Sequence, residues 1–123
     1  MPPVYNKTRL LLLQFRASTQ KSQRSMKYGI VADIERMMMN VMAKIAFAND
    51  ELQNSRERIE LLWTAQRIMH KVCVYTRIVK EVGGMKENGY DAVSDLEDDV
   101  LRQLELWRKS ENNKHLNESP NAK

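Results

Sequence analysis

The chain has 123 residues and a net charge of +4, with 42% hydrophobic and 29% charged residues. These values are typical of one globular domain, and the longest apolar run, residues 10–13, is too short to span a bilayer. Few glycines and prolines among many Leu, Met, Lys, Arg and Glu favour helices over strands. With one cysteine and no apolar leader, we expect a reduced, cytoplasmic protein that is not inserted in a membrane.

The charge is distributed unevenly along the chain. Residues 1–82 contain 14 Lys and Arg against 7 Asp and Glu, whereas residues 83–123 contain 6 against 9. A basic body with an acidic C-terminal segment favours a polyanionic partner, with scattered solvated charge as the alternative.

Two helices are predicted in the first half of the chain. The first covers residues 4–19 after Pro2-Pro3, and residues 18–25 form a polar, serine-rich loop. The second covers residues 27–48 and ends near Asn49-Asp50.

Two more helices follow. Asn54 and Glu57 have the spacing of a capping box that starts the third, and Gly83-Gly84 ends it after residue 82. Asn88-Gly89 predicts a further turn, so the fourth helix is expected over residues 90–109. The polar residues 111–123 are expected to form a disordered tail.

Short connections between four helices predict an all-α fold, an up-down antiparallel four-helix bundle over residues 1–110. Each helix has an apolar stripe with the spacing of a buried face. The stripe of the third helix contains Leu62, Ala65, Met69, Val72, Thr76 and Val79, and that of the fourth contains Val93, Leu96, Val100, Leu104 and Trp107.

The first three helices also carry apolar residues away from these stripes. Large exposed apolar patches are rare on monomers, so we expect the bundle to be a subunit of a homo-oligomer, with scattered exposed side chains as the alternative. The predicted oligomer interface consists of Leu10, Leu13, Met39, Phe47, Trp63, Val74 and Ile78.

No arrangement of residues predicts catalysis. His70 and Cys73 share a helix face, but Cys73 belongs to an apolar stripe, where a free thiol behaves as a small hydrophobe. The acidic run of residues 95–100 lacks the glycine and spacing of a calcium loop. We therefore expect no enzyme activity, no metal and no cofactor.

Basic residues gather on two helices instead. They are Arg56, Arg67, Lys71 and Arg77 on the third helix and Arg9 and Arg16 on the first. On one chain these residues could serve only solubility. Repeated by an oligomer, they would bind the phosphates of RNA or DNA mainly through backbone contacts.

Three segments resemble the accessory variability determinant proteins of bacterial and phage diversity-generating retroelements. They are PVYNKTRLLLLQFR (residues 3–16), KIAFAND (44–50) and DVLRQLELWRKS (99–110). The resemblance covers residues 3–110 and follows the family's order of elements. A second bundle family, encoded by intervening sequences in ribosomal RNA genes, ranks behind it because its signature does not occur here.

The resemblance implies a barrel-like homopentamer without enzyme activity. It further implies binding to a reverse transcriptase and to template RNA or cDNA, in support of mutagenic reverse transcription. By position, Arg77 is similar to a basic residue of the family late in the third helix. A purely structural helical adaptor is the alternative that the residues leave open.

Overall fold

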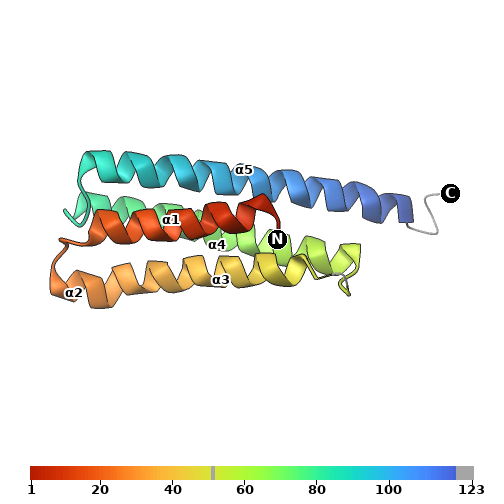
Figure 1. The fold of residues 1–123 in the computed structure, drawn as a ribbon, viewed down its shortest axis with the longest axis horizontal. Coiled ribbons are helices and arrows are strands. Elements are labelled where there is room, and N and C mark those ends of the chain that lie inside the picture. Colours follow the sequence, from red (N-terminus) through yellow and green to blue (C-terminus); the bar gives the residue numbers. More distant parts are fainter. Residues whose placement is uncertain (51, 119–123) are drawn as a thin grey trace.

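The computed structural model describes residues 1–50 and 52–118. Four long helices run alternately up and down beside one another (Figure 1), and no strand occurs among the described residues. The prediction of an all-α, four-helix bundle is therefore confirmed. In chain order the elements are α1 (Pro3–Thr19), α2 (Arg24–Met26), the π-helical segment η1 (Lys27–Val31), α3 (Ala32–Ala48), α4 (Ser55–Glu81) and α5 (Glu87–Glu118).

The helices surround the core in the order α1, α3, α4 and α5. α1 packs against α3 and α5, and α4 packs against the same two helices from the other side. α1 and α4 therefore occupy opposite corners, and α4 lies behind α1 in Figure 1. The outer faces of these two helices point in opposite directions.

The core is formed by the predicted stripes. In α4 every residue of the predicted stripe is buried, and in α5 Leu96 and Trp107 are partly exposed. These stripes bury apolar surface, which is the main favourable term in folding. The largest fully buried side chains include Leu11, Phe15, Ile34, Met38, Ile45, Leu62, Met69 and Leu104.

Both predicted ends of α4 are confirmed. The Asn54 side chain accepts a hydrogen bond from the Glu57 amide, and the Glu57 carboxylate accepts one from the Asn54 amide, which completes the capping box. At the other end, Gly83 has a φ of 86°, and the Gly84 amide donates to the Val79 carbonyl at 2.7 Å. This left-handed glycine satisfies carbonyls that the last turn leaves without helical partners.

The short connection between α3 and α4 is held by an arginine. Arg58 Nε donates to the Ala48 carbonyl at 2.9 Å, and Nη2 donates to the Asp50 carbonyl at 3.0 Å. The Ala48 carbonyl belongs to the last turn of α3 and the Asp50 carbonyl lies just after it, so neither has a partner within the helix. Arg58 therefore joins the beginning of α4 to the end of α3.

The predicted limits of the fourth helix are wrong at both ends. α5 begins at Glu87, so Asn88-Gly89 lies in its first turn, because the reversal is made by Gly83 with its positive φ. Gly89 instead permits a close approach of α1, since a Cβ there would lie 3.0 Å from Ser18 Oγ.

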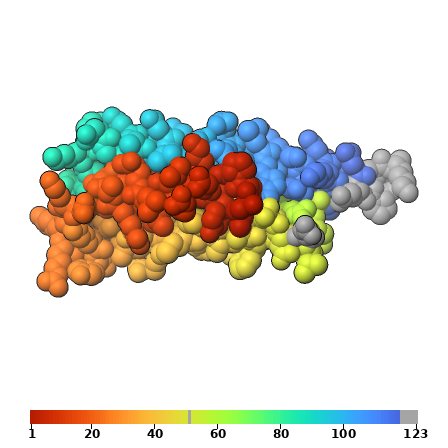
Figure 2. Space-filling view, in the orientation of Figure 1, coloured from red at the N-terminus to blue at the C-terminus, as the bar shows by residue number. Residues whose placement is uncertain are grey.

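At the other end, α5 continues to Glu118 and passes beyond the end of α1 (Figures 1 and 2). Residues 111–118 are thus helical rather than a disordered tail; residues 119–123 lie outside the described part. An ion pair at helical spacing joins Glu111 to Lys114 in this extension. Glu111 is only 3% exposed, and its Oε2 has no hydrogen-bond partner among the described residues.

The second predicted helix is also interrupted. Helical structure begins at Arg24, and η1 separates it from α3 at Gly29, whose φ of −101° and ψ of −108° are not helical. The serine-rich loop is accordingly shorter than predicted and covers residues 20–23.

The capping box gives a test of the fold. Asn54→Ala removes the cap of α4 and should lower the free energy of unfolding by about 1 kcal/mol. Asn40→Ala, at an exposed position within α3, should be neutral or slightly stabilising because alanine favours helix. Urea denaturation followed by circular dichroism measures both, and equal midpoints for the two variants would contradict the role of Asn54.

Candidate nucleic-acid and subunit interface

All seven apolar residues predicted to lie outside the core are exposed. Their exposed fractions run from 37% for Leu10 to 57% for Val74. They occur on three helices: Leu10 and Leu13 on α1, Met39 and Phe47 on α3, and Trp63, Val74 and Ile78 on α4. Their outward position is confirmed, and their use as an oligomer interface stays a prediction.

One exposed stripe of α4 combines both kinds of predicted site residue. Successive members are three or four residues apart, so they share one face of the helix. We call this stripe the outer α4 row; it contains Trp63, Arg67, Lys71, Val74 and Ile78, all exposed. It extends over about 22 Å at 1.5 Å per residue. Arg67 and Lys71 thus lie in the middle of the row, with Trp63 at one end and Val74 and Ile78 at the other.

The structure does not bring the six predicted basic residues together on one surface. Arg9 and Arg16 are on α1, at the corner opposite α4. Four of the six have partners. Arg9 donates a hydrogen bond to the Asn6 side chain. Three form ion pairs: Arg16 with Glu35, Arg56 with Glu60, and Arg77 with Glu81. Arg67 and Lys71 have no ion pair among the described residues. They are therefore the cations of α4 most available to a ligand.

Arg108 is an addition that helical periodicity did not reveal. Its guanidinium lies 4.9 Å from the ring centroid of Trp63, and its Nε donates to Gln66 Oε1 at 2.6 Å. The three residues border a depression of about 580 Å³ between α4 and α5. The attraction between a cation and the face of an indole ring holds the two side chains together. Trp63 therefore presents a fixed ring at one end of the outer α4 row.

A buried carboxyl group lies beside the other end of this row. Glu97 of α5 is 2% exposed, and Thr76 Oγ1 of α4 lies 2.8 Å from its Oε2. Burial raises the pKa of the Glu97 carboxyl to about 7; the Thr76 hydrogen bond acts in the opposite direction, and Asp98 adds to the rise. Glu97 also lines a depression of about 360 Å³ together with Val74 and Ile78.

No hydrogen bond joins Cys73 to His70 among the described residues. The thiol is partly buried, and burial together with the charges of Glu97 and Asp98 raises its pKa to about 12. It is therefore protonated at neutral pH, whereas the thiolate is the nucleophilic form. His70 is exposed and borders the depression near Arg108.

Among the residues that the structure describes there is neither a cluster of potential metal ligands nor a membrane-spanning helix. No group of three or more His, Cys, Asp or Glu residues in this part of the chain is arranged to hold a metal ion. None of the helices within residues 1–50 and 52–118 combines the length and the apolar character that crossing a membrane requires.

The outer surface of α5 is acidic. Asp91, Asp95 and Asp98 are exposed there. Because α5 lies between α1 and α4, this acidic surface separates the cations of those two helices on one side of the bundle. A polyanion on α4 would therefore extend away from α5.

Comparisons with known proteins identify no family for this chain. Neither protein-family models nor curated proteins give a match. The resemblance to the accessory proteins of retroelements therefore stays a prediction from the residues.

Glu97 predicts a dependence of stability on pH. Its pKa is raised by folding from 4.5 to about 7, so the folded state binds this proton more tightly than the unfolded chain does. The stabilisation is present below pH 4.5 and is lost as the pH rises to about 7, by up to about 3 kcal/mol. Glu97→Gln keeps the Thr76 contact without titrating, and should be more stable than the natural protein above pH 7.

Urea denaturation at one protein concentration, from about pH 5 to about pH 8, measures this difference. Glu105→Gln is the matched control, since Glu105 is an exposed carboxylate of the same helix. A stability difference between Glu97→Gln and the natural protein that does not change with pH would contradict the assignment.

Proposed function

We propose that the chain is a non-catalytic accessory protein of a diversity-generating retroelement. In this role it binds the reverse transcriptase and the template RNA or cDNA as a homo-oligomer, a pentamer by resemblance, in the cytoplasm. The outer α4 row is the observation that carries the proposal, because it offers exposed cations and exposed apolar side chains on one rigid helix. The resemblance of residues 3–110 supplies the biological setting.

Assembly is supported by apolar residues on opposite corners of the bundle. Leu10 and Leu13 on α1 face away from Val74 and Ile78 on α4. Two different patches that face apart suit a head-to-tail contact, and such contacts close into rings when the rotation between subunits permits. A ring would repeat each cation of α4 around its circumference.

Nucleic-acid binding is supported by Arg67 and Lys71. They lie in the middle of the outer α4 row and have no ion pair within the described residues. A subunit that covered the whole row would also cover them. The proposal therefore places the subunit contact at the Val74 and Ile78 end and leaves the middle of the row open to phosphates.

One observation favours a second candidate, a purely structural helical adaptor. Four of the six predicted basic residues have polar or acidic partners, so the unpaired charge is smaller than the sequence suggests. In this case another protein would cover the complete outer α4 row, including its cations.

The oligomeric state is the first test. Light scattering coupled to size exclusion should give a mass near five times the 14.4 kDa of one chain. Val74→Asp combined with Ile78→Asp should reduce that mass without unfolding, because both side chains are exposed in the single chain. Leu116→Asp is the matched control, an exposed leucine near the end of α5. A monomeric natural protein would favour the adaptor.

Affinity for nucleic acid is the second test. Arg67→Ala combined with Lys71→Ala should weaken binding of a fluorescein-labelled single-stranded RNA and reduce the salt slope by about 1.4, from two lost phosphate contacts. Arg77→Ala, tested in parallel, should have a smaller effect because Arg77 is paired with Glu81. Fluorescence anisotropy measures these changes over a range of NaCl concentrations.

Lys109→Ala combined with Lys114→Ala removes the same charge from α5, where each lysine is paired with a glutamate. An equal loss of RNA affinity in this control would show that binding depends only on the net charge of the protein. Unchanged affinity in the α4 variant would remove α4 as the nucleic-acid surface.

A further inference from the structure

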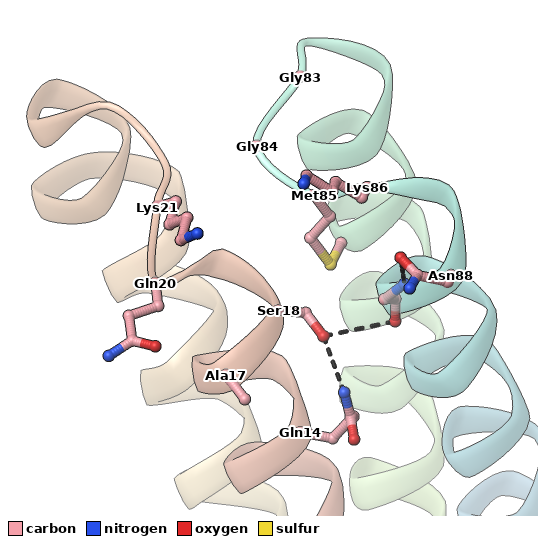
Figure 3. Close-up of a pocket in the computed structure, with 11 residues that line it drawn as sticks. Gln14, Ala17, Ser18, Gln20, Lys21, Gly83, Gly84, Met85, Lys86 and Asn88 are labelled. Carbon is pink, nitrogen blue, oxygen red and sulfur yellow. Dashed lines mark hydrogen bonds between the residues drawn. The ribbon is translucent and has the colours of Figure 1, made fainter.

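A second concentration of positive charge lies at one end of the bundle, away from the outer α4 row. Residues 1–32 contain six Lys and Arg and no Asp or Glu. Three of these cations, Lys21, Arg24 and Lys27, occur within seven residues where α1 is joined to α2 and η1. The connection between α4 and α5, with Lys86, meets them at the same end (Figures 1 and 3).

A cavity of about 470 Å³ separates these two connections. Lys21 stands on the α1 wall and Lys86 on the α5 wall (Figure 3). The remaining polar lining is neutral, and no Asp or Glu occurs among the described residues that border the cavity. The neutral polar side chains on its walls are those of Gln14, Ser18, Gln20 and Asn88.

Hydrogen bonds of Ser18 hold the walls of this cavity in place. Within α1, Gln14 Nε2 donates to Ser18 Oγ at 2.9 Å, and across to α5, Ser18 Oγ donates to the Gly89 carbonyl at 3.5 Å (Figure 3). Gly84 is also fixed, because a Cβ there would lie 2.4 Å from Met26 Sδ and 2.5 Å from Val79 Cγ1. The cavity is therefore part of the packed bundle and not a space between loose loops.

A smaller depression of about 230 Å³ lies on the α3 side of the same end. Lys27 and Arg16 border it, and Arg16 is paired there with Glu35. Gln20 lines both this depression and the larger cavity. The cations of the two connections therefore extend around the end of α1.

Four cations at this end of the bundle have no ion-pair partner among the described residues. Lys21, Arg24, Lys27 and Lys86 form no ion pair within residues 1–50 and 52–118, whereas neighbouring Lys80 pairs with Glu87 at 3.0 Å. Like charges held close together repel one another, and a bound anion relieves that repulsion. We call this group of four the basic end.

An aromatic side chain is exposed beside it. Tyr28 follows Lys27 directly and is 75% exposed, with the Arg24 guanidinium 5.7 Å from its ring centroid. Exposed aromatic rings among cations suit single-stranded nucleic acid, since bases stack on the ring while cations neutralise phosphates. A lipid surface would instead favour a continuous apolar face between the cations.

We infer that the basic end is a second contact for single-stranded nucleic acid, with a backbone phosphate in the cavity between Lys21 and Lys86. The inference rests on the proposed function, because it extends the nucleic acid from the outer α4 row to one end of the bundle. A cavity of this volume accommodates a phosphate and its sugar. The neutral amide and hydroxyl groups on its walls add hydrogen-bond donors.

Substitution of the two cavity lysines tests the inference. Lys21→Ala combined with Lys86→Ala should reduce the salt slope for labelled single-stranded RNA by about 1.4, from two lost phosphate contacts. Tyr28→Ala should weaken binding with little change in the salt slope, because stacking does not depend on counterion release. Lys109→Ala combined with Lys114→Ala again serves as the charge-matched control, at the other end of α5.

The outcomes separate this inference from the proposed function. If the natural protein binds RNA and only the outer α4 row variant weakens it, the inference is overturned and the proposed function stands. If the natural protein does not bind RNA at all, both fail together. Loss of binding to vesicles of anionic phospholipid in the Lys21 and Lys86 variant, with RNA binding unchanged, would overturn the inference in favour of a membrane surface.

Discussion

Burial of one apolar core by four helices is the constraint on which the rest of the structure depends. Each helix can direct only one stripe inward, and those stripes are filled by fully buried side chains such as Phe15, Ile34, Met69 and Leu104. Apolar side chains in excess of the stripe are held outside by the same packing. The exposed apolar residues of α4, such as Trp63, therefore lie on a rigid surface.

The order of the helices around the core decides which surfaces act together. α1 and α4 occupy opposite corners, with acidic α5 on one side between them, so their outer faces point in opposite directions. The connections have the opposite effect. They bring Ser18 and Gly89, which are 71 residues apart in sequence, into contact at one end and gather cations from two distant segments.

Local signals in the sequence predicted much of this arrangement. Asn54 with Glu57, and Gly83 with its left-handed backbone, act through neighbours within a few residues, so their spacing was sufficient. The extent of α5 was not predictable in this way. Asn88-Gly89 resembles a turn, and residues beyond 110 resemble a polar tail, yet α1 packs closely against Gly89 and both segments are helical.

Helical periodicity by itself determined the fold class, the buried stripes and the set of side chains left outside, because these depend on spacing along one helix. Only the tertiary structure decided which of those side chains share a surface. It placed Arg9 and Arg16 at the corner opposite α4 and paired Arg16 with Glu35 of α3. It also buried Glu97 and joined Lys21 to Lys86 across a cavity, since contacts between distant segments follow from how helices pack and not from their spacing.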